Sequence, residues 1–323
     1  MYILDFHKLE EGDILLTAQK AMVSKTVRLI SNSDFSHAIL HVGEGSYIHS
    51  DGDGVHSGNI QRLVFEKPEH VIILRPKQHA QIQKSVTFAR LQIGKQYSVK
   101  DAINTKNPLS KKKEKNRQFC SRLVAQAYAF AGLNLVDNSS YCTPQDIRES
   151  EYLYVIANVL KKASKEEVAF ANSYNPLKKQ TDITNEILIK ARKLTGYDLQ
   201  TLEELSSYII SNKKHDKDVV KIFKNSGYLS MWEHEMLENP WRYDGNIFIS
   251  LPISNKEKRE RAIFEIDSAK KQLKLYSQNY LAYQELSMQG MLDFIKMEMQ
   301  LYKNLINQMN QRLEAANFVL KNT

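Results

Sequence analysis

The hydrophobic pattern of this chain changes its period near residue 163, and this change constrains the fold more than any other feature. Before that point, short apolar runs typical of strands alternate with stretches of helical spacing. After it, strand signals almost vanish and apolar residues recur at helical spacing to the end of the chain. The pattern predicts an α+β domain with an antiparallel sheet and packed helices over residues 1–160, followed by an all-helical domain over residues 161–323.

Individual elements follow from the same pattern. Strands are expected at residues 13–17, 37–43, 46–49 and 70–75, and the Gly-Glu-Gly connection between the second and third predicts a tight hairpin. Helices are expected at 18–30, 79–91 and 120–131, with further helix starts at Thr143 and Ser164. The stretch 255–320 is almost one helical pattern interrupted by Gly290, so two long antiparallel helices and one kinked helix both remain open.

Composition excludes several classes of protein. With 323 residues, of which 42% are hydrophobic and 25% charged, the chain is long enough to bury a sizeable core. Cys120 and Cys142 are the only cysteines, which excludes a disulfide framework and a multi-thiolate metal site and favours a reducing compartment. No apolar run is long enough for a leader or a membrane span, so we expect a cytoplasmic protein, or one exported without a cleaved signal peptide.

The net charge of +8 is concentrated in one segment. Residues 106–122 hold seven basic residues against Glu114 alone and lack apolar periodicity through residue 117, which predicts an exposed loop leading into Cys120. Lys112 and Lys113 could border the cleft and steer substrate, and the loop could also bind an anionic membrane surface. A simple solvated loop is the alternative. Nucleic-acid binding is not expected, because no recognised nucleic-acid motif accompanies the charge.

Cys120, His37 and His49 form the candidate catalytic group. Nucleophilic cysteine chemistry needs a thiolate, a general base that forms it, and a third polar group that orients the base. Cys120 stands at a predicted helix start after the basic loop, where the helix dipole and nearby cations would lower the pKa of a thiol. His37 opens one strand of the predicted hairpin and His49 closes the next, so the two imidazoles are expected to lie close together.

Other interpretations of these residues remain open. A cysteine on an amphipathic helix is often a small buried hydrophobe. The histidines at 37, 41, 49 and 56 raise the alternative of a metal site, but no carboxylate or cysteine pair with a specific ligand spacing is evident nearby, so neither a metal nor a cofactor is expected. His41 is interpreted as structural, His56 could compete with His49 as the orienting group, and Cys142 is interpreted as a bystander.

A series of short motifs resembles a known family. They are listed in chain order: Gly12-Asp13-Ile-Leu-Leu, Phe35-Ser-His37-Ala-Ile-Leu-His-Val-Gly43, Tyr47-Ile-His49, Gly54-Val55, Gly94-Lys-Gln-Tyr97, Phe119-Cys120-Ser-Arg-Leu-Val124 and Tyr141-Cys-Thr-Pro-Gln-Asp-Ile147. In this order they resemble the circularly permuted papain-like amidases of the NlpC superfamily, the YiiX-like group, in which the strand histidine precedes the cysteine. The resemblance covers residues 1–155.

The resemblance implies a permuted papain-like fold with Cys120 as nucleophile, His37 as base and His49 in the third, polar position. YiiX-like members often have a carboxylate there, and a histidine is instead similar to lecithin:retinol acyltransferase-like enzymes, which act on lipid acyl groups. The resemblance also implies that Tyr97 lines the cleft. Ser36, next to His37, is expected to shape the strand entry on the substrate side. The backbone amide of Cys120 is expected to serve in the oxyanion hole.

These observations together predict a cysteine hydrolase that cleaves an amide bond in a peptide or peptidoglycan-like substrate through a thioester. One alternative keeps the nucleophile but acts on a lipid ester or transfers an acyl group. Another is a non-catalytic scaffold whose helical half recruits a protein partner. An apolar stripe rich in Tyr and Met between Tyr276 and Met309 is expected to form the core of a helical bundle, with a partner or membrane groove as the alternative.

Overall fold

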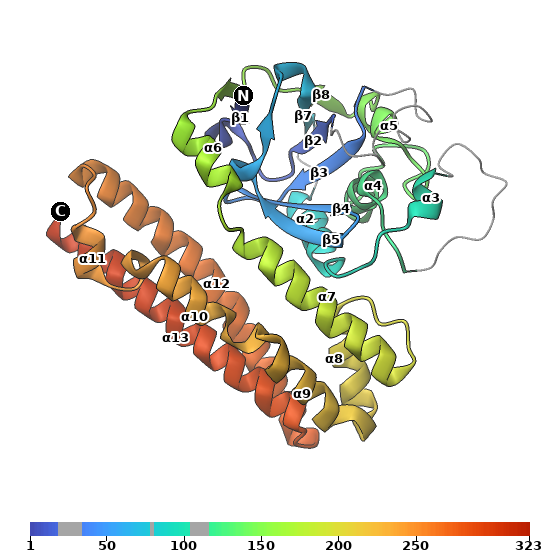
Figure 1. The fold of residues 1–323 in the computed structure, drawn as a ribbon, viewed down its shortest axis with the longest axis vertical. Helices are drawn as coiled ribbons and strands as arrows, with labels where there is room; N and C mark the ends of the chain where they lie inside the picture. The colour runs from blue at the N-terminus through green and yellow to red at the C-terminus, as the bar shows by residue number, and fades with distance from the viewer. Residues whose placement is uncertain (19–33, 78–80, 104–115) are drawn as a thin grey trace. The chain divides into compact units, whose positions relative to one another are not determined.

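The computed structural model describes residues 1–18, 34–77, 81–103 and 116–323 (Figure 1). The chain forms two compact units: the first comprises Met1–Leu188 and Asp198–Leu205, and the second comprises Ile189–Tyr197 and Ser206–Thr323. The first unit therefore extends past residue 160, where the sequence pattern placed a boundary. The expected class is confirmed, because antiparallel sheets with packed helices are followed by a purely helical region.

A six-stranded antiparallel sheet forms the centre of the first unit, with strand order β5-β4-β3-β2-β7-β8. Its strands are β2 (Ile14–Thr17), β3 (His37–His41), β4 (Ser46–Asp51), β5 (Gly54–Asn59), β7 (Val71–Pro76) and β8 (Leu153–Val155). The four predicted strands are all present in it. β5 has no counterpart among them, because its sequence holds two glycines and a single apolar residue, and it forms by pairing with β4 along its whole length.

A smaller sheet lies in the same unit. It consists of β6 (Val64–Phe65), β1 (Tyr2–Leu4) and β9 (Leu160–Lys162), with β1 in the middle and both pairings antiparallel. These strands are only two or three residues long, too short to give a clear alternating pattern.

The turn between β3 and β4 is as tight as the Gly-Glu-Gly sequence predicts. Gly43, Glu44 and Gly45 all have positive φ, at 85°, 50° and 70°. The backbone N–H of Val42 donates to the carbonyl of Ser46 at 2.9 Å, and the N–H of Ser46 donates to the carbonyl of Gly43 at the same distance. Glycine has no Cβ to oppose the left-handed conformation, so this sequence fixes the hairpin register and hence the relative positions of His37 and His49.

Helices cover one face of the large sheet. They are α2 (Ile82–Leu91) and α4 (Cys120–Phe130), with the short α3 (Val99–Ile103) and α5 (Pro144–Arg148) nearby in the chain. Ala38 and Leu40 of β3 share one buried cluster with Cys120, Leu123 and Val124 of α4. The other face, through Leu15, Ile39 and Ile73, packs in a second cluster together with the small sheet. Alternation along the strands therefore gives both faces an apolar core.

The N-terminal turn of α4 is anchored by a buried ion pair. Arg122 Nη2 lies 2.9 Å from Asp101 Oδ2, and the two side chains are 1% and 3% exposed. Arg122 also donates to the carbonyl of Ser140 at 2.8 Å, and its guanidinium lies 4.3 Å from the centroid of the Phe119 ring. These contacts fix the helix start on which Cys120 is placed.

Helices of varied length follow from residue 165 onward. They are α6 (Lys165–Asn172), α7 (Pro176–Thr195), α8 (Leu202–Ser211), α9 (Asp216–Ser226), α10 (Met231–Glu238), α11 (Gly245–Ile249), α12 (Asn255–Gln289) and α13 (Asp293–Asn322). α6 belongs to the first unit, α7 and α8 span both, and the others belong to the second. Ser164 caps α6 with the predicted capping box.

The final stretch is two antiparallel helices. Arg259 of α12 donates to the carbonyl of Leu320 near the end of α13, and the Tyr283 ring near the end of α12 lies 6.5 Å from that of Phe294 at the start of α13. Gly290, with φ of 153°, interrupts the pattern between them. Phe294, Met297, Leu301 and Met309 of the predicted stripe are buried, most of its other residues are partly buried, and Met291 is 53% exposed. No helix in the described part of the chain is both long and apolar enough to cross a membrane.

Some expectations fall on residues outside the described ranges. They are the predicted helix at 18–30, most of the basic loop at 106–117, and the two loop lysines, Lys112 and Lys113. These expectations stay predictions.

Candidate active site

His37 and His49 lie side by side, as the hairpin predicts. His37 Nε2 is 2.7 Å from His49 Nδ1, and the ring centroids are 5.0 Å apart at 76°. The register explains the contact: His49 pairs with Ile39, and His37 precedes Ile39 by two residues on the same face of β3. Both rings are buried, with 7% and 6% exposure.

Burial keeps this histidine pair neutral. It lowers the pKa of His37 to about 4, with the charge of Asp51 opposing the shift and that of His56 adding to it. Burial also lowers the pKa of His49, and the neighbouring His37 and His56 lower it further. At neutral pH His37 is therefore an unprotonated imidazole, which is the state that a general base needs.

Asp51, which the sequence analysis did not single out, and His56 extend the pair into a cluster. Asp51 Oδ2 lies 3.8 Å from His49 Nε2, and Asp51 Oδ1 accepts a hydrogen bond from His56 Nε2 at 3.0 Å. The statement that no suitably placed carboxylate accompanies the histidines is thus wrong. The sequence did contain a signal, because His49 and Asp51 are two residues apart on one strand and therefore lie on the same face of the sheet. This signal could be interpreted only with β5 in place, since β5 pairs His56 with His49.

Asp51 is ionised at neutral pH. Burial acts to raise the pKa of its carboxyl group, but the hydrogen bond from His56 and the charges of His49 and His56 outweigh burial, so that the pKa is lowered well below its usual range. At His56 burial acts to lower the pKa of the imidazole, but the hydrogen bond to Asp51 and the charge of that carboxylate, together with Ser57 and Asp53, raise it. His56 is therefore bonded to Asp51, and it is His49 that contacts His37.

The charge of Asp51 decides where the protons of the histidine pair lie. A carboxylate near His49 Nε2 favours a proton on that nitrogen. His49 Nδ1 then has no proton and accepts the hydrogen bond from His37 Nε2. His37 Nδ1 is left unprotonated, so it is the nitrogen that can take a proton from a nucleophile.

Cys120 is the first residue of α4 and is 4% exposed. Its thiol was expected to have a lowered pKa, and this is wrong: burial raises the pKa, although the backbone N–H groups of Ala38, Ser121 and Cys120 itself favour the thiolate. The cost of desolvating the thiolate therefore outweighs the stabilisation that the helix N-terminus gives it. The resting site holds a neutral thiol and a neutral imidazole rather than an ion pair.

The thiol approaches β3 at the residue that follows His37. Ala38 shares a buried cluster with Cys120, and its backbone N–H acts on the thiol. The hydrogen bonds within the described ranges do not include one between the Cys120 thiol and His37. In enzymes without substrate, catalytic hydrogen bonds are often long and tighten in the substrate complex.

Backbone contacts hold the segment around Tyr97 against β5, which carries His56, and against the residues that precede Cys120. The backbone N–H of Val55 in β5 donates to the carbonyl of Lys95 at 2.8 Å, and Tyr97 forms a parallel bridge with Gln118, two residues before Cys120. Burial raises the pKa of the Tyr97 phenol, and Cys120 and Asp51 raise it further. The tyrosine thus lies within electrostatic reach of the thiol and of the histidine cluster.

The remaining candidate residues are also buried. Ser36 is 6% exposed just before β3, and its N–H donates to the carbonyl of Thr17 at 3.0 Å. His41 Nδ1 lies 2.8 Å from the carbonyl oxygen of Glu10, consistent with a structural role. Cys142 is 2% exposed, and the carbonyl of this residue accepts from Ser121 Oγ at 2.6 Å.

The two thiols are expected to react at different rates. Burial raises the pKa of Cys142 to about 12, with Asp146 and Cys120 adding to the shift, and no backbone N–H opposes it as at Cys120. Iodoacetamide at pH 8 should alkylate Cys120 faster, as followed by mass spectrometry of the two tryptic peptides. The variant Cys142→Ala should retain the rate at Cys120. Equal or faster labelling of Cys142 would contradict the assignment of the reactive thiol.

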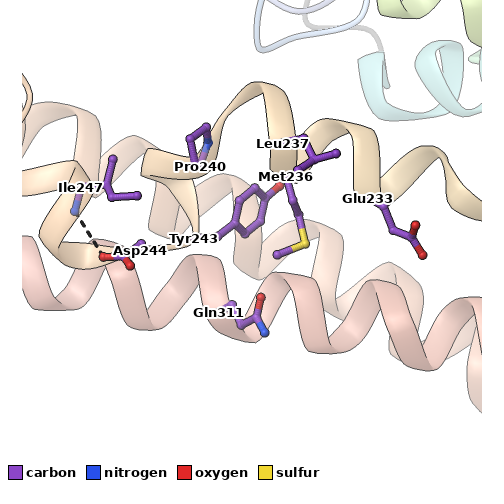
Figure 2. Close-up of a pocket in the computed structure, with 8 residues that line it drawn as sticks. All are labelled: Glu233, Met236, Leu237, Pro240, Tyr243, Asp244, Ile247 and Gln311. Carbon is purple, nitrogen blue, oxygen red and sulfur yellow. Dashed lines mark hydrogen bonds between the residues drawn. The ribbon is translucent and has the colours of Figure 1, made fainter.

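A pocket of about 670 Å³ lies elsewhere, in the second unit (Figure 2). Its walls come from α10, α11, α13 and the connection between α10 and α11: Glu233, Met236, Leu237, Pro240, Tyr243, Asp244, Ile247 and Gln311. None of the candidate catalytic residues lines it, so it is separate from the histidine cluster.

The N-terminal part of the chain matches a known family. Residues 8–152 match the model described as "Permuted papain-like amidase enzyme, YaeF/YiiX, C92 family". The expected YiiX-like resemblance is confirmed over these residues, a little less than half of the chain, and they include the whole cluster from His37 to Cys120. The description supports a cysteine hydrolase of the amidase kind in broad terms.

Part of the chain is also similar to solved structures. The crystal structure of metalloprotein yiiX from Escherichia coli O157:H7 shares 17% sequence identity, and the match covers 46% of this chain and 96% of that one with a TM-score of 0.30. A comparison with curated proteins finds no match.

Proposed function

We propose that this chain is a cysteine hydrolase that cleaves an amide bond in a peptide or peptidoglycan-like substrate. Cys120 is the nucleophile, His37 the general base and His49 the group that orients it. The observation that carries the proposal is the 2.7 Å hydrogen bond between the two buried imidazoles, in a unit where the backbone N–H of Ala38, the residue after His37, acts on the thiol of Cys120 at a helix start. The family match over residues 8–152 supports the reaction class.

The reaction begins with a proton transfer. His37 Nδ1 takes the proton of the Cys120 thiol, and the thiolate attacks the carbonyl carbon of the amide. The backbone N–H of Cys120 donates to the oxyanion of the tetrahedral intermediate. The His37 imidazolium then gives its Nδ1 proton to the departing amine, and the C–N bond breaks to leave a thioester on Cys120.

Hydrolysis of the thioester returns the site to its resting state. His37 Nδ1 removes a proton from a water molecule, the hydroxide adds to the thioester carbon, and the C–S bond breaks. The proton on His37 returns to the sulfur, and the carboxylic acid leaves. Throughout this cycle His37 Nε2 keeps its hydrogen bond to His49, and Asp51 lies 3.8 Å beyond, so the carboxylate stabilises the positive charge that develops on the pair.

His49 is the position on which a second candidate function rests. A Cys-His-His group is similar to that of lecithin:retinol acyltransferase-like enzymes, so transfer or hydrolysis of a lipid acyl group would use the same thioester. The two functions differ in the acyl group that Cys120 carries. A non-catalytic scaffold, in which the helical half recruits a protein partner, would form no acyl group on Cys120.

Replacement of His49 by alanine is expected to lower the rate of p-nitrophenyl acetate hydrolysis by about 10²-fold or more, because His37 loses the acceptor that fixes its tautomer. The effect should fall on kcat more than on KM. His7→Ala, at an exposed histidine of the first unit, is the matched control and should retain the rate. Full activity in His49→Ala would contradict the orienting role.

A further inference from the structure

His49, Asp51 and His56 each offer one potential ligand atom within a small volume. The atoms all lie within 4.8 Å of one another; His56 Nε2 lies 3.0 Å from Asp51 Oδ1, and His49 Nε2 lies 3.8 Å from Asp51 Oδ2. Ligand atoms around a tetrahedral zinc ion are about 3.3 Å apart, given bonds of about 2.0–2.2 Å. The two distances to Asp51 lie close to this value, and the three side chains would have to move closer together to hold such an ion.

A buried nitrogen points to a ligand at this position. His49 Nε2 has no hydrogen-bond partner among the described residues, although the residue is 94% buried, as its 6% exposure shows. A buried polar atom without a partner is energetically unfavourable, and a bound ligand would remove this cost. The Asp51 carboxylate at 3.8 Å is too far to accept a hydrogen bond from it, and a metal ion between the two would bind both.

The scaffold and the outer contacts also fit a metal site. His49 and His56 are directly paired across β4 and β5, with ring centroids 4.3 Å apart. Each ring has an acceptor for the N–H that metal binding leaves on the other nitrogen: His37 Nε2 lies 2.7 Å from His49 Nδ1, and the carbonyl oxygen of Ser57 lies 3.4 Å from His56 Nδ1. Metal-bound histidines in proteins usually have such partners.

We propose that His49 Nε2, an oxygen of Asp51 and His56 Nε2 bind a zinc ion and that this ion switches the hydrolase off. Two imidazoles and one carboxylate are a donor set that zinc prefers, and three protein ligands leave a fourth position for water. Without a metal, His56 Nε2 donates its N–H in a hydrogen bond to Asp51. Metal binding requires this proton to leave Nε2, either for solvent or for Nδ1 of the same ring.

Inhibition follows from the proton positions, and this part rests on the proposed function. A metal on His49 Nε2 leaves the proton of that ring on Nδ1, so His49 becomes the donor to His37 Nε2. His37 then carries its own proton on Nδ1, the nitrogen that should accept the proton of Cys120. The metal-loaded site would thus hold the base in the wrong tautomer, a change known to be severe in triads of this kind.

Cobalt(II) is a spectroscopic substitute for zinc that tests binding without any reference to activity. Adding Co²⁺ to the full chain should give the intense visible absorption of a four- or five-coordinate ion at one equivalent, and Zn²⁺ should displace it. His56→Ala and Asp51→Asn should each weaken binding at least tenfold. Asp53→Asn, at an exposed carboxylate two residues from Asp51, should bind as the parent does.

The outcomes separate the metal site from the proposed function. A spectrum that stays that of free Co²⁺, or one that is unchanged in both His56→Ala and Asp51→Asn, would overturn the site. If the spectrum forms as expected, one equivalent of Zn²⁺ should slow p-nitrophenyl acetate hydrolysis at least tenfold, and a chelator should restore the rate. Binding without inhibition would overturn the switch and leave the metal site standing.

Discussion

The variant Cys120→Ser is expected to lose the burst of p-nitrophenol that marks acylation by p-nitrophenyl acetate and to turn over an amide substrate about 10⁴-fold more slowly. Serine keeps the size of the side chain, but its hydroxyl has a much higher pKa than a thiol and a neutral imidazole activates it poorly at this site. Because Cys120 packs against Ala38 and Leu123, the small substitution should leave the fold intact. Stopped-flow absorbance measures the burst directly.

Cys142→Ser is the matched control for this loss. It removes the other thiol of the chain at a similarly buried position, and it should retain the burst. Circular dichroism should show that both variants are folded. A Cys120→Ser protein with a normal burst would contradict the nucleophile, and loss of the burst in Cys142→Ser alone would reassign it.

The variant Asp101→Ala is expected to lower the free energy of unfolding of the first unit by about 3–5 kcal/mol. It leaves the guanidinium of Arg122 without its counter-charge, although that side chain is 1% exposed. The remaining acceptors, the carbonyls of Ser140 and Arg117, are neutral. The same change removes an anchor of the N-terminal turn of α4. Because Cys120 lies in that turn, we also expect a loss of activity.

Amide hydrogen exchange is the suitable measurement, because both tryptophans, Trp232 and Trp241, lie in the second unit and would not report this unfolding by fluorescence. Exchange in α4 should be faster by about 10²-fold or more in Asp101→Ala, since each 1.4 kcal/mol corresponds to tenfold. Asp34→Ala breaks an exposed pair with Arg148 and should cost less than about 1 kcal/mol. Equal effects of the two variants would contradict the role of the buried pair.

Local signals predicted most of the fold. The strands around Ile14, Ile39 and Ile73 and the helix from Cys120 have apolar residues at clear periods, so pattern alone located them. β5 and the short strands of the small sheet exist only because a partner strand pairs with them, which a one-dimensional pattern does not contain. The two antiparallel helices at the end became distinguishable from one kinked helix only through contacts between α12 and α13.

The residues of the site also divide into those that local sequence signals predict and those that depend on tertiary contacts. His37 and His49 were predictable because a Gly-Glu-Gly turn fixes a hairpin register. Asp51 was missed because its role depends on β5, which brings His56 to the same place. The pKa of Cys120 was predicted in the wrong direction because burial depends on what covers the helix start, and the sequence shows only the helix and its neighbouring charges.

The central claim is that Cys120 carries an acyl group from a peptide during the reaction. Mass spectrometry tests it most directly: the chain is mixed with a digest of peptidoglycan fragments and with phospholipid vesicles in separate samples, quenched in acid within seconds, and cleaved with trypsin. The account predicts a peptidyl thioester on the Cys120 peptide, absent in Cys120→Ser and removed by hydroxylamine. An adduct confined to Cys142, a fatty acyl group as the only adduct, or no adduct under conditions of turnover would contradict it.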